Sequence, residues 1–378
     1  MGLSVGIVGL PNVGKSSTFN ALTKTQNAES ANYPFCTIEP NKAIVNVPDK
    51  RLDALAQIVK PERILHSVVE FVDIAGLIKG ASKGEGLGNQ FLANIKECEV
   101  ILQVVRCFED DNITHVNDKI DPLNDIETIE LELILADIAA LDKRIDRLQK
   151  ALKSSKDAKN LLEYALSLKT HLEELKPAKT FPLNTSEAFL ELDKELRFLS
   201  NKKMIYAANV GEEDLNDLNE HAKKVKNYAK AQNSEFVALC AKLEEEMVSM
   251  SEDEVKEFLQ SLGVEESGLE KTIRLSFKEL GLINYFTAGV KEVRSWTIKK
   301  GSSAPVAAGV IHKDFEKGFI RAETISYDDF IAYKAKPERK KRERYALKVR
   351  IISFKMAMCC IFASMSSVFL NKRYYFLN

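Results

Sequence analysis

Residues 9–16 have the residue types and the spacing of a loop that binds phosphate groups. They read G-L-P-N-V-G-K-S, which matches the pattern G-x-x-x-x-G-K-[ST]. The apolar residues 5–8 predict a buried strand before the loop, and residues 17–22 predict a helix after it. In that context backbone N–H groups can surround phosphate oxygens, and the positive end of the helix dipole adds to the attraction. We therefore expect a nucleoside triphosphate to bind here.

The same loop contains a cation and a hydroxyl group suited to a triphosphate. We expect Lys15 to bridge the β- and γ-phosphates and to act in catalysis, and we expect the Ser16 hydroxyl to ligate Mg²⁺. The nucleotide-binding residues predicted in this loop are Asn12, Val13, Gly14, Lys15, Ser16 and Ser17.

A second metal contact is expected where the strand predicted for residues 68–73 ends. Asp73 begins a D-x-x-G motif, so it should reach Mg²⁺ through water, and the N–H of Gly76 should face the γ-phosphate. The polar and aromatic loop before it ends at Thr37, whose hydroxyl would complete the metal shell when γ-phosphate is present. These motifs, in this order, predict a magnesium-dependent nucleotide switch.

One departure from related switches concerns hydrolysis. Leu77 follows the D-x-x-G motif where Ras-like enzymes have a glutamine that orients the attacking water. Leucine cannot orient water, so we expect slow basal turnover that uses another group. His115 follows the apolar strand predicted for residues 101–105, at the sheet edge where ligands bind, and is our catalytic candidate. A surface histidine with no part in the reaction is the alternative.

Residues 209–212 stand where guanine-specific enzymes have N-K-x-D after a strand. Asn209 is retained, but the lysine is Val210 and the aspartate is Glu212. The longer carboxylate should not hold both guanine N–H groups, so we expect adenine to be the better base. The remaining base-contacting loop, after a strand predicted for residues 235–239, is assigned to Cys240, Ala241 and Lys242.

These motifs resemble those of the YchF / Obg-like ATPase family, a TRAFAC-class group of P-loop NTPases. The resemblance extends over residues 1 to about 333 and is carried by residues 9–16, 34–41, 73–90, 209–212, 285–297 and 312–323. The last two segments are similar to the TGS domain of that family. The resemblance implies an ATPase that also accepts GTP, associates with ribosomes, and has a helical insertion and a β-grasp TGS module.

Composition limits the classes of function. The chain has 378 residues and a net charge of −1, so any contact with nucleic acid must be a local patch. Its six cysteines show no metal-like spacing with the five histidines, which favours unpaired thiols in a reducing compartment. The first predicted strand begins so early that no signal peptide precedes it, so we expect a cytoplasmic protein. The oligomeric state stays open.

Two leucine-rich stripes predict an antiparallel helical hairpin inserted at residues 126–200. A polar turn at residues 153–157 joins them. The hairpin could be a docking arm for a partner or an appendage that only covers the sheet. The stripes consist of Leu131, Leu135, Ile138, Leu141, Ile145, Leu148 and Leu152, and of Leu161, Ala165, Leu168, Leu172 and Leu175.

Short alternating segments from residue 281 onward predict a small β-rich module. Residues 292–298 read as a strand, and residues 304–310 and 324–327 bound the rest. Trp296 should anchor the core of this module rather than stack on a base. Basic side chains could bind RNA phosphates, with a solvated charged surface as the equal alternative: Lys299, Lys300, Lys313, Lys317 and Arg321.

After Tyr333 the sequence departs from the family pattern. It is densely basic at residues 336–344 and then apolar at residues 356–370, a run too short to span a membrane comfortably. Back-translation of residues 348–367, read from the third base, permits a strand–turn–strand that resembles the end of a TGS domain. We therefore infer a reading-frame shift near residues 335–337, which is either present in the gene or an error in its determined sequence. We expect no membrane anchor.

Together these features predict an α/β protein with a Rossmann-like P-loop NTPase domain, an inserted coiled-coil hairpin and a C-terminal β-grasp TGS domain. The expected boundaries are 1–125 and 201–280 for the NTPase domain, 126–200 for the hairpin, 281–334 for a truncated TGS domain and 335–378 for a frameshifted tail. We expect an Mg²⁺-dependent ATPase that also binds GTP and acts as a ribosome-associated switch. The alternatives are a guanine-specific translation GTPase and an RNA- or ribosome-binding module in which hydrolysis is only a slow reset.

Overall fold

The computed structural model describes residues 3–29, 41–74, 87–110, 119–151, 156–322, 324–333 and 375–377. The chain divides into two compact units. Unit 1 comprises Met1–Ser30, Phe35–Val45 and Glu70–Ser276, and unit 2 comprises Ala31–Pro34, Asn46–Val69 and Phe277–Asn378. In the part of the chain described, no helix is both long enough and apolar enough to cross a bilayer.

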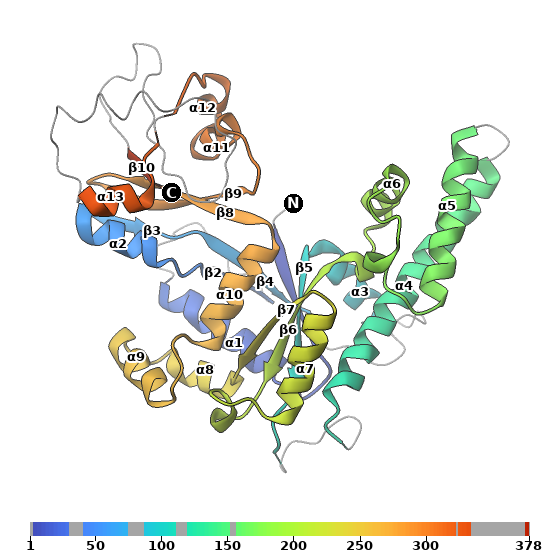
Figure 1. Ribbon diagram of the computed structural model, residues 1–378, viewed down its shortest axis with the longest axis horizontal. Helices are drawn as coiled ribbons and strands as arrows, with labels where there is room; N and C mark the ends of the chain where they lie inside the picture. Colours follow the sequence, from blue (N-terminus) through green and yellow to red (C-terminus); the bar gives the residue numbers. More distant parts are fainter. Residues whose placement is uncertain are drawn as a thin grey trace. The chain divides into compact units, whose positions relative to one another are not determined.

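A six-stranded sheet with the order β2-β4-β1-β5-β6-β7 forms the centre of unit 1 (Figure 1). The pairs that β1 makes with β4 and β5, and that β6 makes with β5 and β7, are parallel. Every residue of β1 and β5 is buried, as expected for central strands of a parallel sheet with helices on both faces. The strands are β1 (Ser4–Val8), β2 (Lys42–Asn46), β4 (Val68–Asp73), β5 (Val100–Arg106), β6 (Lys203–Asn209) and β7 (Glu235–Leu239).

The helices of unit 1 follow the strands in the alternating pattern of an α/β fold. Helix α3 contacts β1, α7 contacts β6 and β7, and α1 packs against α8. Apart from the inserted helices described below, the helices are α1 (Lys15–Glu29), α3 (Leu87–Glu97), α7 (Glu220–Ala231), α8 (Ala241–Met247), α9 (Glu252–Ser261) and α10 (Gly268–Glu279), whose last residues belong to unit 2. This arrangement is the predicted Rossmann-like architecture.

The predicted helical pair is present as α4 (Pro122–Ala151) and α5 (Lys156–Glu173), which lie side by side in Figure 1. A third helix that the sequence stripes did not indicate, α6 (Glu187–Leu196), packs on the same core through Phe189 and Leu192. We call α4, α5 and α6 the helical arm. At the root of the arm, Asp137 accepts hydrogen bonds from Leu199 N (2.8 Å), Ser200 N (2.8 Å) and Ser200 Oγ (2.6 Å).

The predicted stripe on α4 is confirmed at Leu141, Ile145 and Leu148 and is wrong at Leu131, whereas Leu152 lies outside the described residues. Leu141 and Leu148 are buried in the core of the arm, but the side chain of Leu131 is 38% exposed. The reason is that the first half of α4 packs on β5 and α7, which selects a face containing Ile129 and Leu133. Leu175 is likewise exposed because it follows the end of α5 in a left-handed conformation (φ 58°).

Unit 2 contains a four-stranded sheet with the order β10-β8-β9-β3. Strand β8 (Leu282–Ala288) is antiparallel to β9 (Glu292–Lys299) and to β10 (Tyr375–Leu377), whereas β3 (Arg63–Leu65) is parallel to β9. The predicted strand at residues 292–298 is therefore confirmed. Residues 334–374, where the frame shift is inferred, lie outside the described residues.

Helices cover both faces of this second sheet. One face packs Tyr285 and Ile298 against α11 (Ala304–Ile311), and Trp296 joins this cluster as predicted. The other packs Phe286 and Val293 against α2 (Lys50–Val59) and α13 (Tyr327–Tyr333). A short helix, α12 (Lys313–Lys317), follows α11. Residues 304–310 thus form a helix rather than part of a β-rich boundary, with proline in the first turn, where its missing N–H costs nothing.

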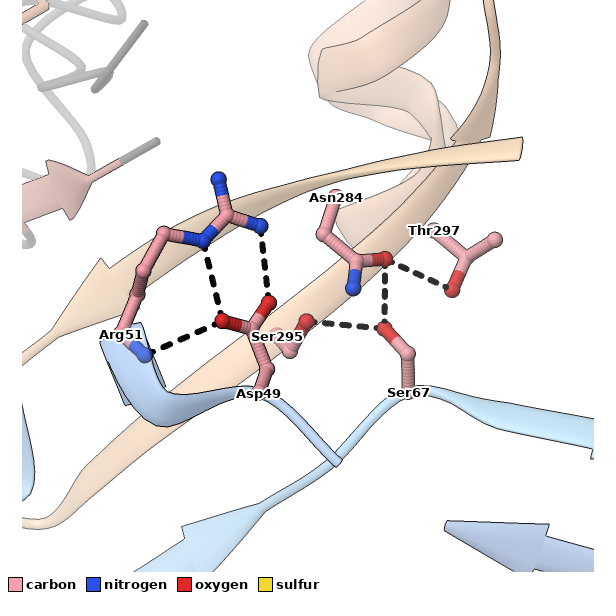
Figure 2. A network of polar contacts seen from close by, with 6 residues as sticks. All are labelled: Asp49, Arg51, Ser67, Asn284, Ser295 and Thr297. Carbon is pink, nitrogen blue, oxygen red and sulfur yellow. Dashed lines mark hydrogen bonds and ion pairs between the residues drawn. The ribbon is translucent and has the colours of Figure 1, made fainter. Parts of the chain in front are cut away.

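The segment Asn46–Val69 leaves the first sheet and belongs to unit 2. Figure 2 shows its polar contacts: Ser67 Oγ donates to Asn284 Oδ1 (2.9 Å) and lies 2.8 Å from Ser295 Oγ. Nearby, the carboxylate of Asp49 accepts from Arg51 Nε (2.9 Å) and Nη2 (2.8 Å). Ser67, Asn284 and Ser295 are buried, and their side-chain oxygens hydrogen-bond to one another. These contacts hold the segment Asn46–Val69 within unit 2.

Candidate functional site

The predicted phosphate loop connects the end of β1 to the first turn of α1, as its sequence context requires. A side chain at Gly9 would place a Cβ 2.8 Å from Val13 Cγ2 and 2.9 Å from Val104 O, so the loop packs directly on the sheet. Asn12 (φ 63°) and Gly14 (φ 93°) both adopt left-handed conformations. These conformations produce the tight turn that directs successive backbone N–H groups to one side.

The first turn of α1 is fixed by a buried threonine. Thr18 is 1% exposed, and both its N–H and its hydroxyl donate to Gly14 O at 3.0 Å. Ser16 is exposed and Ser17 is half-buried in the same turn. The N-terminus of this helix therefore carries an exposed hydroxyl and partial positive charge beside the loop.

Lys15 and Asp73 are brought together although 58 residues separate them. The ammonium of Lys15 donates a hydrogen bond to Asp73 Oδ1, and the two side chains are 11% and 20% exposed. Asp73 ends β4, where its Cα pairs in register with Ile7 of β1. The two neighbouring strands thus place the predicted phosphate-binding cation and the predicted metal contact at one edge of the sheet.

The donor atoms at this edge suit a hard divalent cation. The Ser16 hydroxyl and the Asp73 carboxylate are oxygen donors, as Mg²⁺ prefers, and few protein ligands are needed where phosphates and water supply the others. Among the described residues, no group of three or more His, Cys, Asp or Glu side chains could hold a metal ion independently. The residues present therefore fit Mg²⁺ bound together with a triphosphate.

Asn209 joins the phosphate loop to the predicted base-contacting loop. Its side chain is 5% exposed; Nδ2 donates to Val13 O (2.9 Å), and Oδ1 accepts from Ala241 N (2.9 Å). A Cβ at Gly14 would lie 2.1 Å from Asn209 Nδ2, so glycine is needed for this contact. The structure thus brings the phosphate and base segments predicted from sequence into one site.

The other predicted base-site residues differ in exposure. Val210 is 2% exposed and its N–H donates to Leu239 O (2.9 Å), so its side chain belongs to the core. Glu212 is exposed in the short 3₁₀ turn η5 (Glu212–Asp214), and Lys242 is exposed on α8. Cys240 is buried, and burial raises the pKa of its thiol, which therefore stays neutral at physiological pH.

Two further residues near this edge were not identified from the sequence. Arg106 is 2% exposed at the end of β5, and its guanidinium donates to Phe108 O (3.3 Å) and Asp110 O (3.3 Å). It thereby shapes the start of the loop that leads to His115. Asn219, which precedes α7, donates hydrogen bonds to Cys107 O, just after β5, and to Asp214 Oδ2 in the turn η5. Only its N-cap position could have been found from the sequence.

Three predicted site residues lie outside the described residues: Thr37, Gly76 and His115. Their roles as metal ligand, γ-phosphate contact and catalytic candidate stay predictions. The same applies to Leu77.

Two family models match the chain. A model described as 50S ribosome-binding GTPase matches residues 4–137. The model YchF-GTPase_C, described as a protein of unknown function, matches residues 282–356. These matches cover the phosphate loop and the start of the helical arm in the first case, and β8 through α13 in the second.

Proteins named Ribosome-binding ATPase YchF are similar to the chain over most of its length. The protein of Bacillus subtilis is 52% identical over 335 residues, which is 88% of this chain and 91% of that protein. The protein of Pasteurella multocida is 52% identical over 349 residues, or 92% and 95% of the two chains. The protein of Escherichia coli O157:H7 is 53% identical over 335 residues, or 88% and 91%.

Solved structures share the fold. The YchF GTPase of Schizosaccharomyces pombe superposes with a TM-score of 0.83 at 36% identity, covering 95% of this chain and 97% of that one. A GTP-binding protein of Pyrococcus horikoshii has a TM-score of 0.55 at 23% identity, covering 86% and 94%, and is similar in fold alone. These similarities confirm the predicted P-loop α/β fold.

Proposed function

Because this chain belongs to the YchF family, we propose that it is an Mg²⁺-dependent ATPase that also binds GTP and acts as a nucleotide-gated switch on the ribosome. Relatives at about half identity are named ribosome-binding ATPases. The proposed location is the cytoplasm, where ribosomes and nucleotides are available. The single observation that carries the proposal is the Asn209 side chain, which joins the phosphate loop to the base segment at the edge where Lys15 meets Asp73.

In the proposed mechanism, the N–H groups of the phosphate loop hold the β- and γ-phosphates, and Lys15 neutralises charge that develops during hydrolysis. Ser16 and Asp73 would hold Mg²⁺ with Thr37, and the Gly76 N–H would face the γ-phosphate. Mg²⁺, when bound, would neutralise part of the negative charge of the triphosphate. Asp73 pairs with Lys15 in this structure, so binding of phosphate by Lys15 and of the metal by Asp73 would be coupled through these two residues.

We propose that base selection favours adenine over guanine. Specificity for guanine requires an aspartate whose two oxygens accept from the base, and this chain has Glu212 on the exposed turn η5. Val210 is a core residue, so the position that a lysine occupies in guanine-specific enzymes offers no polar group to the ligand. GTP is expected to bind with equal or weaker affinity.

Slow basal turnover is part of the proposal. Leu77 cannot orient water, and His115 is the candidate for that role. If hydrolysis only resets the switch, the ordering of the loops by the γ-phosphate is the functional event. A steady-state assay with and without ribosomes tests this point, because substantial basal turnover that ribosomes leave unchanged would contradict a ribosome-gated switch.

Basic side chains of unit 2 offer a contact surface for ribosomal RNA. Lys299, Lys300 and Lys313 are exposed, as are Lys317 and Arg321. Binding that depends on phosphates should weaken steeply as salt increases. Cosedimentation with ribosomes at two salt concentrations, with wild type and with Lys299→Glu/Lys300→Glu, tests this surface.

Calorimetric titration of the full chain with ATP and with GTP, each with Mg²⁺, tests the central proposal. We expect saturable binding of ATP. Glu212→Asp should move the preference toward GTP by several-fold, because the shorter carboxylate can reach both guanine N–H groups. Glu257→Asp is the matched control, since the same change is made on an exposed glutamate of α9, outside the predicted base-contacting segments. Absence of heat with both nucleotides would refute the proposal.

A further inference from the structure

We propose that Asn219 is a positioning residue for the loop that reads the purine base, and that it contributes to the choice between ATP and GTP. The base loop is defined here as residues 210–214, between β6 and the segment that leads to α7. The inference rests on the proposed function, since a base loop has meaning only if a purine nucleotide binds.

The start of the base loop is held by main-chain hydrogen bonds to both neighbouring strands. Cys107 N donates to Asn209 O (2.8 Å), which extends the pairing of β5 with β6 by one residue. Val210 N donates to Leu239 O (2.9 Å) on the other side. The loop then turns in η5, where Asp214 N donates to Gly211 O (3.2 Å). The position of Asp214 therefore fixes the turn that presents Glu212.

Asn219 holds the far end of this loop with a single side chain. Its Nδ2 donates to Cys107 O (2.7 Å) and to Asp214 Oδ2 (2.7 Å). Its Oδ1 accepts from Ala222 N (2.9 Å) and so caps α7. One amide thus connects the end of β5, the base loop and the first turn of α7, and both N–H donors of the amide are used on the first two of these partners.

The hydrogen bond from Asn219 Nδ2 to Cys107 O matters because Cys107 is also paired with Asn209 at the end of β6. Cys107 contacts the asparagines on both sides of the base loop. Its N–H donates to the main-chain oxygen of Asn209, and its carbonyl accepts from the side-chain amide of Asn219. The Asn209 side chain holds the phosphate loop and Ala241. Asn209 therefore holds the start of the base loop, and Asn219 holds its end.

The alternative is that Asn219 serves only as the N-cap of α7, and Asn219→Asp separates the two roles. Aspartate keeps the acceptor for Ala222 N and is as good a cap as asparagine. It removes both donated hydrogen bonds and places a carboxylate beside the carboxylate of Asp214 and the carbonyl of Cys107. A residue that only caps the helix would tolerate this change, whereas a residue that positions the base loop would not.

The experiment compares three ligands on the full chain, with Mg²⁺ present: ATP, GTP and inorganic tripolyphosphate, which has no base. For Asn219→Asp we expect about 5- to 20-fold weaker ATP binding, as the loss of two hydrogen bonds to charged or backbone acceptors implies. The ratio of GTP to ATP dissociation constants should approach one, and the affinity for tripolyphosphate should stay at the wild-type value.

A swap of donor and acceptor provides a rescue. In Asp214→Asn/Asn219→Asp, the new amide at 214 can donate to the new carboxylate at 219, so discrimination between ATP and GTP should partly return. Asn184→Asp is the matched control: Asn184 Nδ2 donates to Lys179 O (2.6 Å) in the segment between α5 and α6, and its loss should leave all three affinities unchanged. If Asn219→Asp does not fold, Asp214→Ala tests the same link from the loop side.

Wild-type affinities for ATP and GTP in an Asn219→Asp chain that retains its thermal midpoint would overturn the inference. An equal loss of tripolyphosphate affinity would also overturn it, because the effect would then not be confined to base reading. Failure of the wild type to bind any of the three ligands would instead refute the proposed function, so the two failures are distinguishable.

Discussion

The ammonium of Lys15 and the carboxylate of Asp73 form an ion pair across the ends of β1 and β4. One partner comes from the phosphate loop and the other from the D-x-x-G motif. Each group therefore neutralises the other in this structure, and the proposed function requires that phosphate and metal take the place of these partners. This relationship makes Lys15 the first residue to test.

Lys15→Met should lower the affinity for Mg²⁺-ATP by at least about 100-fold, because two or more charge-assisted hydrogen bonds to phosphate are lost. Isothermal titration of the full chain measures the effect. Lys24→Met is the matched control, since Lys24 also lies on α1 and also pairs with a carboxylate, Glu245 (2.8 Å). A variant at position 15 that binds ATP as tightly as the control would contradict the role of Lys15.

Gly14→Ala should destabilise the protein by about 2–4 kcal/mol and disconnect the phosphate loop from the base loop. The new Cβ would lie 2.1 Å from Asn209 Nδ2, at a backbone φ of 93°. Chemical denaturation measures the change in the free energy of unfolding. Gly289→Ala should have little effect, because among the described residues its Cβ would meet only Glu292 O, at 3.7 Å. Equal stability of the two variants would argue against the Asn209 contact.

Asp137→Ala should cost about 3 kcal/mol of unfolding free energy, because it leaves the buried N–H groups of Leu199 and Ser200 without an acceptor. Burial raises the pKa of Asp137 to about 6, although three hydrogen bonds oppose that shift. Asp146→Ala, at an exposed position on the same helix, is the control. Urea unfolding followed by circular dichroism should show a large loss only for Asp137→Ala.

Ionisation of the buried Glu244 carboxyl should lower the free energy of unfolding as the pH rises from about 5 to 7. Burial raises the pKa of this carboxyl from 4.5 to about 7, helped by Glu270 and opposed by hydrogen bonds from Leu269 N, Gly268 N and Ser267. Between these pKa values the folded state binds more protons than the unfolded state. The contribution of Glu244 to the free energy of unfolding is therefore fully present below pH 4.5 and is lost as the pH passes 7.

Glu244→Gln cannot titrate and serves as the reference for this effect. The difference in unfolding free energy between wild type and variant should decline by up to about 3 kcal/mol across that window. Denaturation at several pH values between 5 and 8 gives this difference directly. A difference that does not vary with pH would show that Glu244 stays ionised at the N-terminus of α10.

The N-terminal part of the site was predictable because local sequence determines it. A buried strand, a glycine-rich turn and a helix follow one another at residues 4–29, and Lys15 lies within this unit. Asn209 could be placed because the apolar strand before it is evident in the sequence; in the structure Asn209 is the last residue of that strand, β6. The contact between Lys15 and Asp73 follows from the parallel pairing of β1 with β4, which brings the carboxyl ends of both strands to one edge.

Long-range packing was not predictable in the same way. The face that α4 buries changes along its length because its neighbours change, and no periodicity in the sequence reports this, so Leu131 was misplaced. The hydrophobic composition of residues 304–311 does not distinguish a helix from a strand. The pairing of Arg63 with Glu292 spans 229 residues, and neither segment alone identifies the other.

The excursion of Asn46–Val69 has a practical consequence for dissecting this protein. Leu52 and Leu55 are fully buried against Phe286 and Val293, which come from the C-terminal third of the chain. A fragment ending near residue 280 would keep α2 and β3 but lose β8 and β9, which contact them. Apolar surface of α2 would then be exposed to solvent and prone to aggregation. Truncation therefore damages the part that remains, and point substitution in the intact chain is the safer route to assigning roles.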